Sequence, residues 1–440
     1  MRKIKFINPS IYVDQDQVLK LKKIYLPGTA LLFLAALTPP EFEVSYTDEF
    51  IDDVNFDCDA DLICIGLNTY QARRAYVLAD EFRRRGKPVI LGGIHASLMP
   101  NEAKLHADCV AIGEADDIWP EILGDYLRNA LSPFYRPAAA PALDKLVIPR
   151  LDLLNLKKCG RPPFSKLPVV SIETSRGCPN QCDFCVVGPF HKPARFKPID
   201  KLVQEIQKIG AKYYLFSDSN IAMNSLHAKE LFKALIPLGI KWFSAFTVDA
   251  GKDTELLTLA VKSGCLAAFL GIESLGEENL RAVNKRAYSL DRYRKLINNF
   301  HSCGLPIQAS LILGMDYDTE ASILEMVRFI NANHIDKISL YALTPFPGTV
   351  LYNRLLREGR LPDPVYWLNS KKPIYGVHFT PRNFTPERLT EVYWETYQKL
   401  LSYSSIFRRL LWPPAPQCIN SLVSNLFTRK AVYNKQVSYT

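Results

Sequence analysis

Three cysteines within eight residues constrain this chain more than any other feature of its sequence. They occur at the spacing C-x3-C-x2-C in the run Ser175-Arg176-Gly177-Cys178-Pro179-Asn180-Gln181-Cys182-Asp183-Phe184-Cys185. Packing does not explain such a density of thiols, whereas thiolates so close in sequence can converge on one metal centre. Apolar β-branched residues precede the run, and a helical pattern follows from Ile199. The run therefore reads as a loop at the carboxyl end of a strand, where α/β folds place their chemistry.

Different metal sites are compatible with this run. Three cysteine ligands would leave the fourth iron of a cubane iron–sulfur cluster open. A structural zinc with His191 as fourth ligand is an alternative, although the second ligand pair typical of zinc modules is absent. A disulfide with one spare thiol is disfavoured because the sequence shows no signal-peptide pattern and its other cysteines are scattered, mostly among apolar residues.

Composition narrows the class of protein. The 440 residues, with 48% apolar and 22% charged side chains, are enough for two or three ordinary globular domains. The net charge of +9 is spread along the chain, so it permits an anionic ligand or a membrane surface but does not argue for nucleic acid. The longest apolar run, residues 30–37, is too short to cross a bilayer. Ten cysteines without a signal pattern predict a cytoplasmic protein.

Residues 1–131 alternate apolar runs with helical patterns. The expected strands are 3–8, 42–47, 61–67, 87–91 and 108–112, and the expected helices are 29–38, 70–85, 101–107 and 118–129. This alternation predicts an α/β domain with a doubly wound, Rossmann-like parallel sheet that binds its ligand beyond the carboxyl ends of the strands. Glycines at those ends, Gly92-Gly93 and Gly113, would let the backbone approach a bulky ligand closely.

Residues 168–350 contain six further strand–helix units. The expected strands are 168–174, 212–217, 240–246, 266–272, 306–313 and 336–342, and each is followed by a helical pattern, for example 201–209, 225–238, 254–263, 290–303 and 319–333. Six successive units fit a partial (β/α)6 barrel with its ligand-binding loops at the carboxyl ends of the strands. The proline- and alanine-rich residues 132–167 are expected to be a linker.

The last part of the chain, residues 351–440, is expected to be a mainly helical extension. Its aromatic residues are expected in the core rather than in a site: Trp367, Tyr375, Phe379, Tyr393, Trp394 and Tyr397. Residues 406–412 combine apolar and cationic side chains. They fit either a helix lying in a membrane interface or a packed terminal helix.

The cysteine loop, with Phe184 just before its third cysteine, resembles that of the radical S-adenosylmethionine (SAM) enzymes. The resemblance implies that Cys178, Cys182 and Cys185 hold a [4Fe–4S] cluster whose open iron binds the methionine end of SAM. It also implies that one electron cleaves SAM to a 5′-deoxyadenosyl radical. Phe184 would then lie near the adenine.

Residues 1–131 resemble the cobalamin-binding domains of one large branch of that family. The resemblance lies in Thr69-Tyr70-Gln71-Ala72-Arg73-Arg74-Ala75-Tyr76, Gly86-Lys87-Pro88-Val89-Ile90-Leu91-Gly92-Gly93-Ile94-His95 and Ile112-Gly113-Glu114-Ala115. It implies a cobalamin site made by Asn68, Thr69, Gly92, Gly93, His95, Gly113 and Glu114. The D-x-H-x-x-G motif of the mutases is absent, which implies cobalamin without a protein histidine on cobalt. Two readings stay open: a domain that has lost its ligand, and a His95 that only bonds within its turn.

The barrel strands end in residues that resemble the family's SAM-binding motifs. Gly271-Ile272-Glu273-Ser274 is similar to the family's Gly-Ile-Glu-Ser, whose glutamate reaches the nucleoside, although a structural pair with a basic residue is an alternative. The Gly-Gly-Glu motif is absent after the second strand, so Asp218 and Asn220 are assigned its role. The resemblance completes the SAM site with Thr247, Asp249, Ser310 and Gly314.

Two further segments, Gly314-Met315-Asp316-Tyr317-Asp318-Thr319 and Thr344-Pro345-Phe346-Pro347-Gly348-Thr349, look like those of the subgroup that includes hopanoid methylases. The expected function is a cobalamin-dependent methyltransferase acting on an unactivated carbon of a lipid or natural product. Its expected partners are a small-molecule or lipid substrate and an electron donor such as flavodoxin or ferredoxin. A radical cyclase or rearrangement enzyme without methyl transfer, and a non-catalytic iron–sulfur or cobalamin sensor, are the alternatives.

Overall fold

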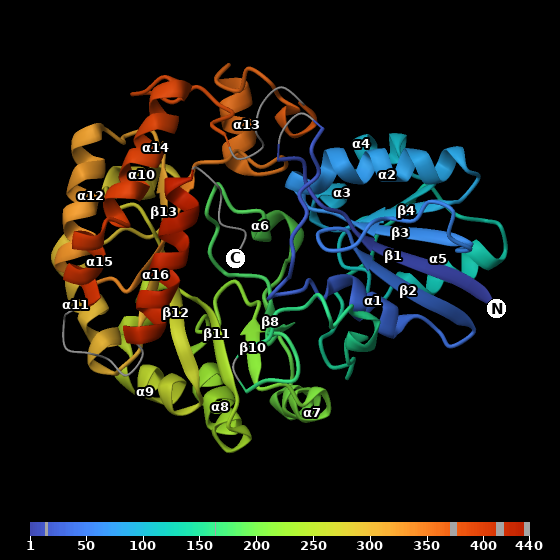
Figure 1. The fold of residues 1–440 in the computed structure, drawn as a ribbon, viewed down its shortest axis with the longest axis horizontal. Helices are drawn as coiled ribbons and strands as arrows, with labels where there is room; N and C mark the ends of the chain where they lie inside the picture. Colours follow the sequence, from blue (N-terminus) through green and yellow to red (C-terminus); the bar gives the residue numbers. More distant parts are fainter. Residues whose placement is uncertain (14–15, 163, 370–375, 411–417, 435–440) are drawn as a thin grey trace.

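The computed structural model describes residues 1–13, 16–162, 164–369, 376–410 and 418–434. Figure 1 shows two parallel sheets side by side, each covered by helices, with further helices from the end of the chain packed on the second. The predicted architecture, a doubly wound sheet followed by a partial barrel and a helical extension, is confirmed.

The first sheet has the strand order β2-β1-β3-β4-β5-β6, and all its neighbouring strands are parallel. Its strands are β1 (Arg2–Asn8), β2 (Phe42–Asp48), β3 (Leu62–Gly66), β4 (Val89–Gly92), β5 (Cys109–Ala111) and β6 (Phe134–Tyr135). The reversal of direction between β1 and β3 is the switch point at which such sheets bind ligands. Strand β6 lies in the segment expected to be a linker, where Val110 pairs with Phe134.

Helices cover both faces of this sheet. They are α1 (Ala30–Leu37), α2 (Ala72–Arg84), α3 (Ile94–Leu98), α4 (Pro100–Leu105) and α5 (Trp119–Leu127). Helices α2, α3 and α4 pack with Ile63, Ile65 and Leu91. Helices α1 and α5 pack with the alternate residues of the same strands, Leu62 and Cys64. Because successive side chains of a strand point to opposite faces, this split produces the doubly wound arrangement.

The second sheet is the partial barrel, with the strand order β14-β13-β12-β11-β10-β7, all parallel. Its strands are β7 (Val170–Ile172), β10 (Tyr213–Phe216), β11 (Lys241–Phe246), β12 (Cys265–Glu273), β13 (Ile307–Leu313) and β14 (Lys337–Ala342). The helices between them are α7 (Ile199–Ile209), α8 (Ser225–Leu235), α9 (Thr254–Lys262), α10 (Glu277–Ala282), α11 (Leu290–Ser302) and α12 (Glu320–Ala332). Strands β8 (Ser175–Arg176) and β9 (Arg195–Phe196) form an antiparallel pair that flanks the cysteine loop and the short helix α6 (Val187–Phe190).

The C-terminal extension contains α13 (Val350–Arg357), η5 (Tyr366–Leu368), α14 (Pro386–Leu400), α15 (Tyr403–Leu410) and α16 (Cys418–Tyr433). Helix α15 buries Ile406 and Arg409 and leaves Phe407 exposed, which favours the reading of a packed terminal helix. The aromatic residues Trp367, Phe379 and Tyr397 are buried. Tyr375, Leu411 and Trp412 lie outside the described residues. Within the described chain, no helix is both long and apolar enough to span a membrane.

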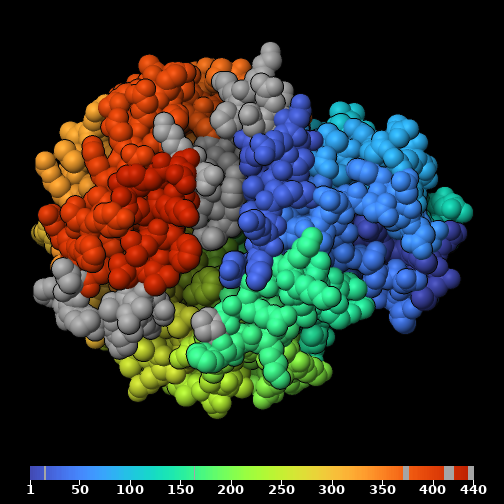
Figure 2. All heavy atoms as spheres, in the orientation of Figure 1, coloured from blue at the N-terminus to red at the C-terminus, as the bar shows by residue number. Residues whose placement is uncertain are grey.

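The two sheet domains pack closely against each other. Figure 2 shows the N-terminal residues in blue on one side, the barrel and the C-terminal extension in green to red on the other, and a bright green segment along the lower side of the junction. The contacts join loops that follow strands of the two sheets, such as Tyr70 after β3 and Phe346 after β14, whose ring centroids lie 5.5 Å apart. The indole of Trp367, in the C-terminal extension, donates a 3.0 Å hydrogen bond to Glu102 of α4. The carboxyl-terminal loops of both sheets therefore meet at one junction.

Candidate active site between the two sheets

The cysteine loop is fastened on several sides. At its start, Thr174 Oγ1 donates a 2.8 Å hydrogen bond to Asp218, which also accepts a bond from Ser175. In its middle, the backbone N–H of Asp183 donates to the carbonyl of Val283 at 3.0 Å. The carbonyl of Asp183 accepts a 2.9 Å bond from the backbone N–H of Leu351, the second residue of α13. Anchors on the barrel and on the extension fix the path of the loop.

The three cysteine side chains of this loop are free thiols and partly exposed. Burial raises the pKa of Cys182 to about 11; the neighbouring Cys185 and Cys178 thiols act in the same direction, and Lys285 opposes them. Burial also raises the pKa of Cys185, again with a contribution from Cys178. These mutual effects show that the three thiols lie near one another.

The arrangement fits a cluster better than a single ion. Among the described residues, no three His, Cys, Asp or Glu groups converge where one metal ion could bind. In a cubane, each cysteine binds a different iron, so the sulfurs are spaced more widely than around one zinc. His191, the fourth ligand of the zinc alternative, places its Nδ1 2.8 Å from a carboxylate oxygen of Glu114. The residues present therefore suit a [4Fe–4S] cluster held by three thiolates.

Glu273 stands beside the cysteines at the end of β12. Its carboxylate accepts a 2.8 Å hydrogen bond from Ser310 and lies 3.3 Å from the ammonium of Lys285. Its φ of +64° is in the left-handed region, and the register of β12 with β13 shifts at this point. Such a backbone is uncommon for a residue other than glycine and is typical of functional sites. The structure thus brings Cys182, Glu273 and Ser310 together.

Asp218 and Asn220 are both buried after β10. Burial raises the pKa of Asp218 to about 6, and hydrogen bonds from Ser175 and Thr174 oppose that rise. Asn220 accepts a 3.3 Å bond from the backbone of Ala222. Asp218 thus fixes the start of the cysteine loop by accepting hydrogen bonds from Thr174 and Ser175.

The remaining barrel candidates occupy different surroundings. Thr247 is partly buried and begins the short helix η4 (Val248–Lys252). Burial alone would raise the pKa of Asp249, but hydrogen bonds from Lys252 and Tyr288 outweigh it and lower that pKa. Asp249 therefore belongs to a separate ionic group, which the structure does not join to Glu273.

Gly314 and Phe184 complete the barrel side. Gly314 has φ +100°, and its N–H donates a 2.8 Å hydrogen bond to Asp318. A β-carbon at Gly314 would lie 2.6 Å from a methyl group of Leu389 in α14, and its positive φ would strain any other residue, so glycine is favoured beneath the extension. Phe184 is partly buried and packs against the main core.

On the side of the first sheet, Asn68 caps η1 (Thr69–Gln71) with a capping box. Thr69 Oγ1 lies 3.2 Å from Nδ1 of His95, and Nε2 of His95 lies 3.0 Å from Glu102. His95 is fully buried, and its ring joins the loop after β3 to α4, so its side chain does not bond only within its own turn. The polar atoms of the His95 ring are thus directed to protein groups.

Gly92 and Gly93 end β4 close to the loop after β3. Gly93 has φ +96° and ψ −175°, a conformation that is essentially restricted to glycine. A β-carbon there would lie 2.7 Å from the carbonyl oxygen of Leu67, whereas one at Gly92 would make only ordinary contacts. Gly93 is therefore required for the close packing of the two loops at this sheet edge.

Replacing Gly93 by alanine is expected to lower the free energy of unfolding by roughly 3 kcal/mol, from backbone strain and the contact with Leu67. Gly86→Ala is the matched control, because Gly86 also has positive φ but has no atom within 4 Å of the added carbon. We expect that control to cost about 1 kcal/mol. Urea denaturation of the apoprotein measures both, and equal losses would contradict this account of Gly93.

Gly113 and Glu114 follow β5 and reach the barrel. The N–H of Gly113 donates to Ser97 at 2.8 Å. The Glu114 carboxylate lies 2.8 Å from the guanidinium of Arg176 and also pairs with Arg195 and His191. Burial alone would raise the pKa of Glu114, but hydrogen bonds from these three side chains lower it to about 2. Glu114 thus joins the first sheet to the strands that flank the cysteine loop.

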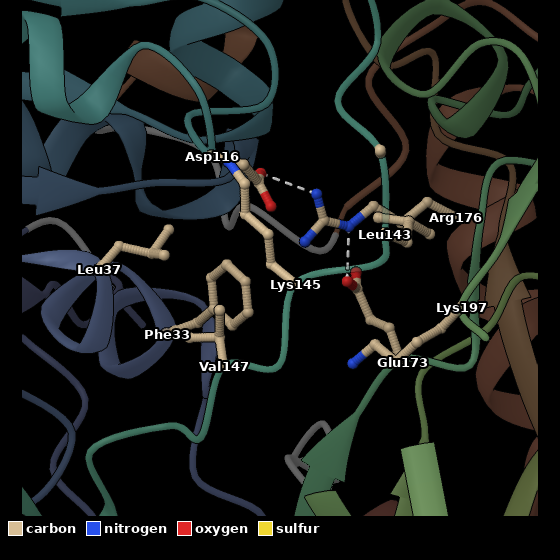
Figure 3. A pocket seen from close by; sticks show the side chains of 10 residues that line it. Phe33, Leu37, Asp116, Leu143, Lys145, Val147, Glu173, Arg176 and Lys197 are labelled. Atoms are coloured by element: carbon tan, nitrogen blue, oxygen red, sulfur yellow. Dashed lines mark hydrogen bonds and ion pairs between the residues drawn. The ribbon is translucent and has the colours of Figure 1, made fainter. Parts of the chain in front are cut away.

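A small pocket, partly open to solvent, lies beside this ionic junction. Figure 3 shows Arg176 pointing between Asp116 and Glu173, with which it forms ion pairs of 2.8 and 2.6 Å. Two lysines that line the pocket are paired as well, Lys197 with Glu205 and Lys145 with Asp117. Among the described residues that line this pocket, every cation is paired, and the pocket marks the contact between domains.

Arg176 and Lys285 belong to the site although no sequence motif marks them. Arg176 lies two residues before Cys178 and pairs with residues about 60 positions away in the chain. Lys285 follows α10, and only the fold brings it to Glu273. The only local feature that could have indicated a role for Lys285 is the short polar run Asn284-Lys285-Arg286. That run is equally typical of a solvent-exposed turn.

The comparisons with known proteins agree with this geometry. The family model described as the radical SAM superfamily matches residues 172–330. Bacteriochlorophyllide d C-8(2)-methyltransferase from Chlorobaculum tepidum is 30% identical over 417 residues, which cover 91% of each chain.

Two solved structures share the fold. The cobalamin-dependent SAM radical enzyme OxsB, with aqua-cobalamin and SAM bound, matches with a TM-score of 0.70 and 13% identity, over 99% of this chain and 72% of its own. The radical SAM methyltransferase TsrM from Kitasatospora setae, with cobalamin and a [4Fe–4S] cluster bound, matches with a TM-score of 0.63 and 16% identity, over 81% and 75% of the chains. The family model and the sequence identity across nine-tenths of both chains establish that this chain belongs to the radical SAM superfamily.

Proposed function

We propose that this protein is a cobalamin-dependent radical SAM methyltransferase that methylates an unactivated carbon of a lipid or natural product. The observation that carries the proposal is the junction of the two sheets, where the glycine-lined strand ends of the first meet the cysteine loop of the second. The methyltransferase name of a relative that matches nearly the whole chain supports methyl transfer. That relative's name also makes a chlorophyllide the first natural product to assay.

On the barrel side, Cys178, Cys182 and Cys185 would hold the cluster, which supplies the electron that cleaves SAM. Glu273 would accept hydrogen bonds from the ribose, since its carboxylate is already oriented by Ser310. Lys285 lies beside both Glu273 and the thiols, where it would pair with the carboxylate of SAM. Asp218 would act one step away, by holding the loop that carries the cysteines.

On the side of the first sheet, the loops at Asn68-Thr69, Gly92-Gly93 and Gly113 would line the cobalamin, which carries the methyl group. The interdomain contacts of Tyr70 and Glu114 would keep this cofactor opposite the barrel. Orientation of substrate, cofactor and SAM, together with the exclusion of water, is the protein's contribution to such chemistry. No protein acid or base is assigned.

We also propose an electron donor and a class of substrate for this enzyme. Under this proposal, the enzyme works in the reducing cytoplasm and receives electrons from a flavodoxin or ferredoxin. Its substrate is a small molecule or a lipid, and a lipid would be met at the membrane surface by peripheral contact. Nucleic acid is not part of the proposal.

The products formed from SAM test the proposal without the natural substrate. Cobalamin-dependent methyl transfer converts SAM to S-adenosylhomocysteine, whereas the radical step gives 5′-deoxyadenosine. With reductant, both products are expected from the reconstituted enzyme, and S-adenosylhomocysteine should disappear when cobalamin is omitted. 5′-Deoxyadenosine alone would favour a cyclase or rearrangement enzyme, and neither product would favour a sensor.

A further inference from the structure

The inner face of the barrel carries a polar row along its last strand. In β14, Ile338 and Leu340 are 5% and 3% exposed and belong to the apolar core that also contains Leu389 and Leu400 of the covering helix α14. The alternate residues Lys337, Ser339 and Tyr341 point to the other side, and Tyr341 is 49% exposed. Since successive side chains alternate between faces, these three share the inner face of the barrel. That face is open to solvent at Tyr341.

Contacts with β13 confirm this orientation. The register pairs Lys337 with Gln308 and Ser339 with Ser310. The amide of Gln308 donates a 2.9 Å hydrogen bond to the hydroxyl of Ser339. Ser310, on the same face as Gln308, donates to Glu273. Lys337 therefore lies on the same inner face as Ser310, at the amino-terminal end of the strands, and the candidate SAM site lies at their carboxyl end.

Lys337 differs from the other lysines of the barrel that lie near the site. Lys285 and Lys197 are each matched by a glutamate, Glu273 and Glu205. Across the residues that the structure describes, the ammonium of Lys337 has no carboxylate or hydrogen-bond acceptor, and burial alone lowers its pKa. The ammonium is not among the fully buried polar atoms that lack a partner, so solvent reaches it, and a bound anion can take the place of that water.

The geometry points to Lys337 as the residue that binds an anionic group, a carboxylate or a phosphate, of the substrate. This inference rests on the proposed function, because the substrate is what that function places inside the barrel. Gln308 pairs with Lys337 on the neighbouring strand, and Ser339 is two residues further along β14 on the same face. Both supply neutral hydrogen-bonding groups beside the ammonium. Together they form a subsite for an oxyanion.

The depth of this subsite limits the substrate. Lys337 and Tyr341 are the first and fifth residues of β14, so they are separated by roughly 13 Å along the strand. The reacting carbon must lie near the carboxyl end of the barrel, beside Glu273 and the cysteines. The anionic group is thus several bonds from that carbon, as in a long-chain acid, a lipid phosphate or a macrocycle with a carboxylate side chain.

The carboxylate of SAM is a less suitable occupant. It must bind near the cysteine loop, where Lys285 already lies. Lys337 begins β14 at the opposite, amino-terminal end of the strands. Lys337 is therefore expected to affect substrate binding and to leave SAM binding unchanged.

Equilibrium dialysis with the reconstituted holoenzyme tests this inference. The probes are dodecanoate and dodecyl phosphate against dodecanol, and chlorophyllide a against its methyl ester. We expect wild type to bind at least one anion tenfold more tightly than its neutral counterpart. Lys337→Met should reduce that preference to below twofold, and Lys337→Arg should retain it. Which anion is preferred identifies a lipid acid, a phosphate or a macrocyclic acid as the source.

Lys262→Met, on the exposed surface of α9, is the matched control and should keep the preference. Circular dichroism and products from SAM are recorded for every variant. The inference is overturned if wild type prefers no anion, or if the preference survives in Lys337→Met. If wild type forms no S-adenosylhomocysteine but still prefers an anion, the proposed function is refuted and this inference is not.

Discussion

Alanine at Cys178, Cys182 or Cys185 is expected to abolish the iron–sulfur cluster and to reduce SAM cleavage by at least roughly a hundredfold. Each thiolate would bind a different iron, so a single loss removes one corner of the cluster. Iron content, the visible absorbance of the cluster and 5′-deoxyadenosine formation measure the effect after anaerobic reconstitution.

Cys303→Ala provides the control for the cysteine variants. Cys303 is also a partly exposed free thiol, but it lies after α11, where its sulfur is within 3.7 Å of the carbonyl of Thr254. We expect this variant to keep wild-type iron content and SAM cleavage. A loop variant that held as much cluster as Cys303→Ala would show that its cysteine is not a ligand.

Loss of Arg176 is expected to have the largest effect on stability. Its side chain is 9% exposed and pairs with Glu114, Asp116 and Glu173. Arg176→Met removes the cation that pairs with Asp116 and Glu173, while Glu114 keeps Arg195 and His191, and the change should lower the free energy of unfolding by about 3–5 kcal/mol. Urea denaturation of the apoprotein measures this change separately from any effect on the cluster.

The exposed pair of Arg150 and Asp152 offers a matched comparison. Their side chains are 41% and 60% exposed, so Arg150→Met should cost at most about 1 kcal/mol. If Arg176→Met were no more destabilising than Arg150→Met, the interdomain ion group would not stabilise the fold.

The pH dependence follows from the same group. The pKa of Glu114 falls from its ordinary 4.5 to about 2 in the folded protein. Its contribution to stability is thus present above pH 4.5 and is lost as the pH falls toward 2. Arg176→Met should flatten this part of the stability profile.

Much of the fold could be predicted because both sheets have strong local signals. The predicted strands of residues 3–8 and 306–313 overlap β1 and β13, whose apolar residues are buried. Strand β6 was missed because it has only two residues, in a proline-rich segment whose pairing with β5 is not encoded locally. Helix α3 was missed because its five residues after Gly93 are too few for a periodic pattern.

The candidate site was less predictable from the sequence. Motifs indicated Glu273, and the structure places it beside Cys182 and Ser310. His95 and Glu114 also stood in motif positions. Most of their partners come from distant parts of the chain, so the sequence alone does not show whether these side chains face a ligand or other protein groups. The bond between Trp367 and Glu102 spans 265 residues. The three cysteines needed no such information, since their spacing alone brings them together.

Anaerobic reconstitution with iron, sulfide and hydroxocobalamin tests the central claim most directly. After desalting, iron analysis and the ultraviolet–visible spectrum give the cofactor content of each chain. We expect about four irons and one cobalamin per chain, because the account assigns one cubane cluster to the cysteine loop and one corrinoid to the first sheet. Iron without cobalamin would contradict the assignment of the first sheet as a cobalamin site, and a protein that retained neither would contradict the account as a whole.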